Sequence, residues 1–290
     1  MFVNSLRNRL KTFCILVIIK TKTNEKKWII ILISILFSSC EKGDDSIIKR
    51  NSNGLLSRIL ISGELYQEFT YTNSGLIYEE KSCGTYIKYT YNSDNQLERQ
   101  DYYIDPALYS SSMQVITEAQ KRKEWANPNN VPKSVTNTYS YPKTGQFIER
   151  YVDRTNGTQS YAKYELNEKG LVSKQIFYDD DKPTGYIDYL YDGQGNLTRK
   201  MHYFISADGK SYLSNETEYE FDNKRNPYFP FKKLLNPGLY TNLNNITKET
   251  YTLYGELPVE IERVQITTHT YEYNESGYPI KVDGIWVYEY

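Results

Sequence analysis

The chain has 290 residues, of which 39% are hydrophobic and 15% aromatic, and its formal net charge is −1. This average hides an asymmetry, because residues 1–39 hold seven basic side chains and one acid, Glu25, which leaves the rest of the chain acidic. An acidic domain lacks the basic face that dominates nucleic-acid affinity, so nucleic acid is excluded as a partner. All thirty tyrosines follow residue 39, and tyrosine favours half-buried strands, so an aromatic all-β fold is expected there.

Residues 1–39 have the layout of a signal peptide with a long basic region. The apolar runs at 13–19 and 28–37 are each much shorter than the roughly 20 residues that span a bilayer. Lys26 and Lys27 precede the second run and small residues follow it, as in secretory signals. An uncleaved anchor and a true start downstream of Met1 stay open as alternatives.

Cys40 is the predicted site of lipid attachment. Residues 36–40 read Leu-Phe-Ser-Ser-Cys and resemble the lipobox of bacterial lipoproteins, in which small residues precede the acylated cysteine. An ordinary signal peptide cut nearby is the alternative. Acyl chains that bury about 0.8 kcal/mol per CH₂ would hold the protein to a membrane. The acidic residues 41–46 resemble the export tag of Bacteroidetes surface lipoproteins, and a solvated linker is again the alternative.

A short phrase recurs from residue 47 onward. It reads aromatic, any residue, aromatic, Asn or Asp, two residues, Gly or Asn, any residue, and then an apolar residue or Pro. The glycine-equivalent positions are 54, 75, 95, 145, 170, 195, 225 and 277. Their spacing indicates a unit of 20–30 residues, with two gaps about twice that length.

Each phrase predicts two strands joined by a tight turn. Residues i and i+2 of a strand share a face, so both aromatics point the same way. Asn or Asp then begins a turn, and Gly or Asn supplies a position with positive φ. We therefore predict, over residues 47–290, a single antiparallel meander of roughly 14–18 strands built from these hairpins. A sheet of that length must twist and curl, into a β-roll or a half-open barrel.

Two longer segments interrupt the repeats. Residues 110–125 fit a helix and an alternating strand equally well, and both readings stay open. Residues 228–247 are rich in Pro and Asn and predict a long excursion that covers an edge or an end of the sheet.

The sequence predicts no catalytic residue and no cofactor. Cys83 is the only cysteine after Cys40, so a disulfide framework within this part of the chain is excluded. His202 and His269 lie in strand-like runs without a metal-ligand pattern, and we interpret both as sheet-face histidines. Nucleophile-elbow and phosphate-loop motifs are also missing from the sequence.

Two weak groups of binding candidates remain. Asp179, Asp180 and Asp181 could hold Ca²⁺ through their carboxylates, but their spacing lacks the alternating Asp/Asn pattern of a calcium loop, which favours a solvated turn. Trp125 and Trp286 could stack on a sugar or grip a partner protein, although positions in the aromatic ladder or the last strand also account for them.

The phrase Tyr189-Leu-Tyr191-Asp192-Gly-Gln-Gly195-Asn-Leu197 resembles the tyrosine–aspartate (YD) repeat of RHS-type proteins. Residues 47–290 resemble more closely a family of uncharacterised Bacteroidetes surface lipoproteins with degenerate YD repeats. The segments that carry this resemblance are 222–228, 244–248 and 271–279. The resemblance implies a fold and a location, and it supplies no catalytic residues.

We therefore expect an outer-membrane lipoprotein, facing the cell exterior, that acts as a binding or structural module and not as an enzyme. Its expected partners are the membrane, through the lipid, and a glycan or protein ligand. One alternative is a periplasmic-facing envelope factor or an apolar-ligand carrier, which would contain a large apolar cavity. Another is a carbohydrate-active enzyme such as a glycoside hydrolase, which would place two buried carboxylates in one cleft, with a raised pKa.

Overall fold

A computed structural model describes the backbone of residues 15–19 and 29–33, and residues 54–82, 84–104, 129, 131–154, 156–254 and 264–290 in full. The chain divides into two units, residues 1–45 and 46–290. In the first unit, β1 (Ile15–Ile19) pairs antiparallel with β2 (Ile29–Ile33), which lies in the apolar run of the predicted signal peptide. None of the described helices is long and apolar enough to cross a membrane.

Several predictions from the sequence concern residues outside the described ranges. They are lipid attachment at Cys40, the acidic linker 41–46, the lone thiol of Cys83, and the choice between helix and strand for 110–125, which includes Trp125. These remain predictions.

The second unit is all-β and contains 17 described strands. In chain order they are β3 (Arg58–Ile61), β4 (Glu64–Tyr71), β5 (Ile77–Ser82), β6 (Thr85–Tyr91), β7 (Leu97–Ile104), β8 (Lys133–Lys143), β9 (Gln146–Asp153), β10 (Gln159–Leu166), β11 (Val172–Asp179), β12 (Lys182–Tyr191), β13 (Leu197–Ile205), β14 (Ser211–Phe221), β15 (Ile246–Leu253), β16 (Val264–Thr268), β17 (Tyr271–Tyr273), β18 (Pro279–Val282) and β19 (Trp286–Glu289).

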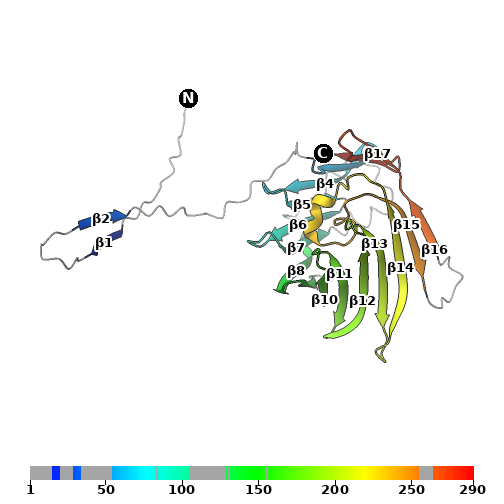
Figure 1. Cartoon of the computed structure of the whole chain (residues 1–290), viewed down its shortest axis with the longest axis horizontal. Coiled ribbons are helices and arrows are strands. Elements are labelled where there is room, and N and C mark those ends of the chain that lie inside the picture. Colours follow the sequence, from blue (N-terminus) through cyan, green and yellow to red (C-terminus); the bar gives the residue numbers. More distant parts are fainter. Residues whose placement is uncertain are drawn as a thin grey trace. The chain divides into compact units, whose positions relative to one another are not determined.

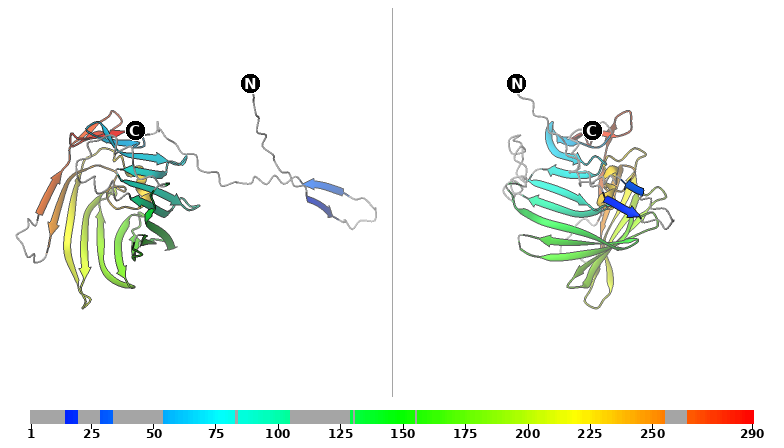
Figure 2. Two further views of the ribbon diagram at one scale, coloured as in Figure 1. Left: turned by 180° about the vertical axis from the view of Figure 1, so that it is seen from behind. Right: turned by 90° about the vertical axis from the view of Figure 1, so that its left-hand side faces the viewer.

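The strands form one antiparallel sheet that curls almost into a ring (Figures 1 and 2). Each strand from β3 to β16 pairs with its neighbour in the chain, and β19 returns to pair with β3. β16 and β17 are successive parts of one bent segment, in which β16 pairs with β15 and β17 pairs with β18. Among the described residues no ladder joins β16 to β17, so the sheet is not closed there. We call residues 264–273 the seam. The predicted curled meander is thus confirmed.

The repeat turns have the chemistry that the sequence predicts. In the clearest copy, Asp192 Oδ1 accepts hydrogen bonds from the backbone N–H groups of Gln194, Gly195 and Asn196 at 2.7–2.9 Å. Gly195 has φ 101°, and Asn95 takes the equivalent position with φ 57°. Asn tolerates this left-handed conformation because its short polar side chain bonds locally, which explains why Asn can replace Gly at this position.

The second aromatic of the phrase links one repeat to the preceding one. Its hydroxyl donates to the backbone carbonyl of the apolar residue that follows the previous turn, as Tyr191 does to Val172 at 2.7 Å. The same bond joins four further pairs: Tyr71 to Leu56, Tyr91 to Ile77, Tyr141 to Leu97, and Tyr290 to Pro279. These bonds satisfy carbonyls beside register shifts in the ladder, and burial of the ring raises the pKa of Tyr141 to about 12.

The two ends of the described array complete a single repeat. Gly54 has the positive φ of the turn glycine, but no aromatic pair precedes it locally. Tyr288 and Tyr290 supply that pair from the far end of the chain, because β19 pairs with β3 and Ser57 N donates to Glu289 O at 2.7 Å. The copy at Gly54 is thus assembled from residues more than two hundred positions apart.

The excursion between β14 and β15 enters one end of the curled sheet (Figure 1). It contains the 3₁₀ helix η1 (Phe229–Leu234), whose Phe231 and Leu234 are buried in the core beside Phe69 and Tyr89. Leu235 packs against a second core cluster, which Phe147 and its neighbours form. The expected end cover is therefore also part of the core, because the thin sheet face needs apolar partners to bury its aromatics.

Candidate binding site

A cavity of about 380 Å³ lies at the seam. We call it the seam pocket. It is lined by residues of β3 and β4, of the excursion, of the start of β15, and of the segment from His269 to Tyr288. Its size falls within the roughly 300–1,000 Å³ usual for small-molecule sites. Segments from both ends of the described array meet here because β19 pairs with β3.

One end of the seam pocket is charged. His269 follows β16, and its Nδ1 lies 2.8 Å from Asp283 Oδ2 while its Nε2 lies 3.5 Å from Glu249 Oε1. Asp283 Oδ1 also accepts from the backbone N–H of Thr270 at 2.7 Å. Partial burial would raise the pKa of Asp283, but the hydrogen bonds from His269 and Thr270 outweigh it and hold this pKa below its usual range.

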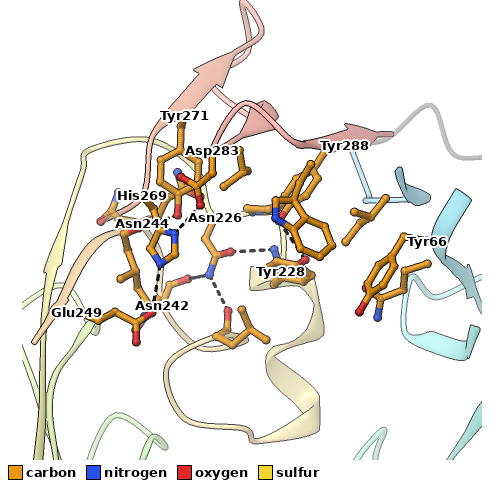
Figure 3. A pocket seen from close by; sticks show the side chains of 18 residues that line it. Tyr66, Asn226, Tyr228, Asn242, Asn244, Glu249, His269, Tyr271, Asp283 and Tyr288 are labelled. Carbon is orange, nitrogen blue, oxygen red and sulfur yellow. Dashed lines mark hydrogen bonds and ion pairs between the residues drawn. The ribbon is translucent and has the colours of Figure 1, made fainter. Parts of the chain in front are cut away.

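The other end of the seam pocket is aromatic. The rings of Tyr66 and Trp286 meet edge to face, with centroids 5.0 Å apart and an interplanar angle of 80°. Tyr66 is 37% exposed, so part of its ring is open to solvent. Figure 3 shows His269, Asp283 and Glu249 gathered on one side and Tyr66 on the other, with Asn226 and Tyr228 between them.

The charged end holds an imidazole between two carboxylates. A histidine oriented by an aspartate through Nδ1 resembles the base of an acyl-transfer site. Here, however, the other ring nitrogen faces Glu249, and no serine or cysteine is among the described residues that line the pocket. The described residues also contain no group of three side chains that could hold a metal ion. What this wall provides is carboxylate acceptors, an imidazole and aromatic faces.

A second cavity, of about 360 Å³, lies between the sheet and the excursion. We call it the chamber. Its wall carries two carboxylates, those of Glu80 and Glu149, together with several tyrosine hydroxyls. The wall also contains apolar side chains, among them Ile87, Phe147 and Leu234, so the chamber has a mixed lining and not the large apolar cavity expected of an apolar-ligand carrier. The carboxylates match one feature expected of a glycoside hydrolase, two such groups in one cavity.

The chamber's carboxylates are occupied by the protein itself. Glu80 accepts from Tyr89 Oη at 2.8 Å and from Gln67 Nε2 at 2.6 Å. Glu149 accepts from the hydroxyls of Tyr139 and Tyr164 and from Asn137 Nδ2, at 2.5–2.8 Å. Burial raises the pKa of Glu80, although these hydrogen bonds oppose the shift. Such mutual satisfaction is what a structural network requires.

The structure places the predicted candidates in different surroundings. Trp286 lies in the wall of the seam pocket. Asp180 and Asp181 occupy the two central positions of the exposed β11–β12 turn, both with positive φ, and Asp181 accepts from Tyr161 Oη at 2.7 Å. His202 lies on β13 against Phe177, where burial and then Lys200 lower its pKa.

Sequence reasoning missed the charged end of the seam pocket. His269 was interpreted as an ordinary sheet-face residue, and Glu249, Asp283 and Tyr66 were not singled out. The available signal was local: His269-Thr270 directly precedes the aromatic pair Tyr271 and Tyr273, and Asp283-Gly284 forms a turn with positive φ at both residues. Neither feature reveals that the two segments face each other.

Comparisons with known proteins give weak likenesses. No family model matches the chain, and no curated protein matches it. A porin-like protein from Bacteroides uniformis is similar at a TM-score of 0.36 and 15% identity, over 81% of this chain and 97% of that one. A porin-like protein from Bacteroides vulgatus gives 0.37 and 12%, over 81% and 98%. The TcdB2–TccC3–Cdc42 structure gives 0.28 and 14%, over 74% of this chain and 10% of that one. At these TM-scores the likenesses carry no functional argument.

Proposed function

We propose that this protein is a lipid-anchored envelope protein, displayed at the outer membrane, that binds a ligand in the seam pocket and catalyses no reaction. The observation that carries the proposal is the difference between the two cavities. The chamber's carboxylates are satisfied by protein donors, whereas the seam pocket holds partly exposed carboxylates beside a partly exposed aromatic wall. Groups that remain solvated are those that a ligand can engage without breaking the fold.

The anchor and its display follow from the sequence resemblance. Residues 36–40 end in a lipobox-like cysteine and residues 41–46 form an acidic tag. Metabolic labelling with an alkyne fatty acid is expected to label the wild-type chain and not the Cys40→Ala variant. Protease added to intact cells is expected to degrade the wild-type domain. Protection of the domain until the outer membrane is broken would contradict surface display and favour a periplasmic-facing role.

Ligand binding can be followed through Trp286 itself. The chain has three tryptophans, so a Trp28→Phe/Trp125→Phe variant of the full chain reports on the seam pocket alone. Trp286 emission is then recorded against four sets of small molecules: neutral saccharides, quaternary ammonium ions, carboxylates and aromatic fragments. We expect at least one set to give a saturable change that Tyr66→Ala weakens. The absence of a response to every set would contradict a binding role for the pocket.

A further inference from the structure

We infer that the ligand of the seam pocket is a neutral saccharide, with one sugar ring packed against the Tyr66–Trp286 wall and its hydroxyls bonded at the Asp283–Glu249 end. This inference rests on the proposed function and specifies its ligand. Three observations carry it: the chemistry of the aromatic wall, the disposition of the polar groups, and the charge of the pocket.

The aromatic wall offers both a stacking surface and a hydrogen-bond donor. The apolar C–H face of a pyranose packs on aromatic rings, and Tyr66 is 37% exposed beside Trp286. No described residue accepts a hydrogen bond from the indole N–H of Trp286. A fully buried nitrogen of this kind would count as a buried atom without a partner, and the Trp286 nitrogen does not. The indole N–H is therefore accessible, and a sugar oxygen beside the ring would accept from it.

The charged end offers acceptors held in fixed positions. Asp283 is oriented by His269 and by the backbone of Thr270, and its side chain is 32% exposed. Glu249 is 37% exposed and has a single, longer contact, that with His269. Ionised carboxylates accept strongly from vicinal hydroxyls, and a preoriented acceptor loses little freedom on binding. Two such acceptors opposite an aromatic wall fit a ring with one apolar face and a polar rim.

A buried amide in the same wall lacks a partner. Asn242 is 1% exposed and lines the seam pocket, and its Oδ1 accepts from Leu197 N at 2.7 Å. Its Nδ2 has no hydrogen-bond partner. Buried polar groups are almost always hydrogen-bonded, so this nitrogen is an exception, and its burial keeps it out of the set of groups that the saccharide contacts.

The charge of the pocket excludes other small ligands. No lysine or arginine is among the described lining residues, so phosphate, sulfate and acidic sugars would meet two carboxylates without a fixed cation. A quaternary ammonium ion would suit the carboxylates and the aromatic rings. However, both carboxylates already face the His269 imidazole, and a quaternary ammonium ion has no hydrogen-bond donor for their remaining lone pairs. Neutral hydroxyls bind the remaining lone pairs and leave His269 in place.

The test uses the Trp28→Phe/Trp125→Phe full chain and two kinds of ligand. The saccharides are the methyl glycosides of glucose, galactose, mannose and N-acetylglucosamine, with their β1,4- and α1,4-linked disaccharides, and the competing cation is tetramethylammonium. We expect a saturable change in Trp286 emission with at least one saccharide, at a dissociation constant of about 0.1–10 mM. Tyr66→Ala and Asp283→Asn should each weaken it at least about fivefold, roughly the loss of one good contact.

Tyr212→Ala is the matched control. Tyr212 is 45% exposed and stacks on Phe204 in the β13–β14 hairpin, so its removal costs an exposed aromatic pair outside the seam pocket and should leave the affinity unchanged. Near-ultraviolet circular dichroism checks that every variant is folded. Saccharide binding unchanged in both pocket variants would overturn the inference, as would the absence of any saccharide response. A response to tetramethylammonium alone would overturn the saccharide while leaving the proposed binding function standing.

Discussion

The seam pocket and the chamber are similar in volume and both contain two carboxylates, but these carboxylates differ in their hydrogen-bond partners. The chamber lies between regular repeat strands and the excursion, and tyrosines of those strands place a hydroxyl opposite each acid. The seam pocket lies where the repeat is interrupted, and its two acids share His269, while Asp283 also accepts from the backbone of Thr270. The repeat tyrosines satisfy the chamber's two acids, although Asn137 Oδ1 in the same wall has no partner. The acids of the seam pocket stay partly exposed, so a ligand can reach them.

The largest expected effect is a difference in unfolding free energy between an acid removed from the chamber and one removed from the seam pocket. Glu149→Ala removes the acceptor of three donors in the chamber and should lower the free energy of unfolding by about 2–4 kcal/mol. Glu249→Ala removes one long, partly exposed contact in the seam pocket and should cost less than about 1 kcal/mol. Urea unfolding of both variants measures the difference. Equal losses of unfolding free energy in the two variants would contradict the proposed difference between the chamber and the seam pocket.

The pH dependence of stability sharpens the contrast. The pKa of Glu80 is raised in the folded state above an unfolded value of about 4.3. The contribution of Glu80 to the free energy of unfolding is therefore fully present below about pH 4.3 and is lost as pH rises through the folded-state pKa. Glu80→Gln should flatten the decline in unfolding free energy from acid to neutral pH. A slope that persists unchanged in this variant would mean that Glu80 is not the group responsible.

Removing one inter-repeat bond should have a moderate effect. Tyr191→Phe deletes the hydroxyl that binds the Val172 carbonyl and should cost about 1 kcal/mol. Tyr273 has the same place in its copy near the seam, but it donates to the side chain of Asp222 instead. Tyr273→Phe leaves a part-exposed acid that water can solvate, so it should cost less. Thermal unfolding of both variants measures the two losses, and a loss in Tyr273→Phe as large as that in Tyr191→Phe would contradict this expectation.

The smallest effect on the unfolding free energy should come from Asp283, and its pH dependence should run opposite to that of Glu80. The folded-state pKa of Asp283 is lowered, so its contribution is present above an unfolded value of about 3.9 and is lost as pH falls through the folded pKa. Asp283→Asn should therefore narrow the stability difference between neutral and acid pH. The effect should be slight because the carboxyl is partly solvated. Denaturant unfolding between pH 2 and pH 7 would measure it, and a wider difference would contradict the assignment.

The turns and the approximate number of strands could be predicted because they depend on short stretches of sequence. The aromatic pair, the Asn or Asp, and the glycine-equivalent position lie within seven residues, and their backbone consequences are local. The sequence therefore predicts the turns and the approximate number of strands. It also predicts the excursion that covers one end, although burial of Phe231 and Leu234 in the core was not foreseen.

The amino-acid sequence by itself determined the repeat, the turn chemistry and the curl of a long sheet, because strand periodicity and positive φ depend on near neighbours. Only the tertiary structure decided where a ligand can bind. The seam pocket brings Tyr66 against Trp286 and His269 against Asp283, and the first of these pairs is set by the β19–β3 register. No local pattern encodes that register. It is fixed when Tyr288 and Tyr290 complete the repeat that begins at Gly54.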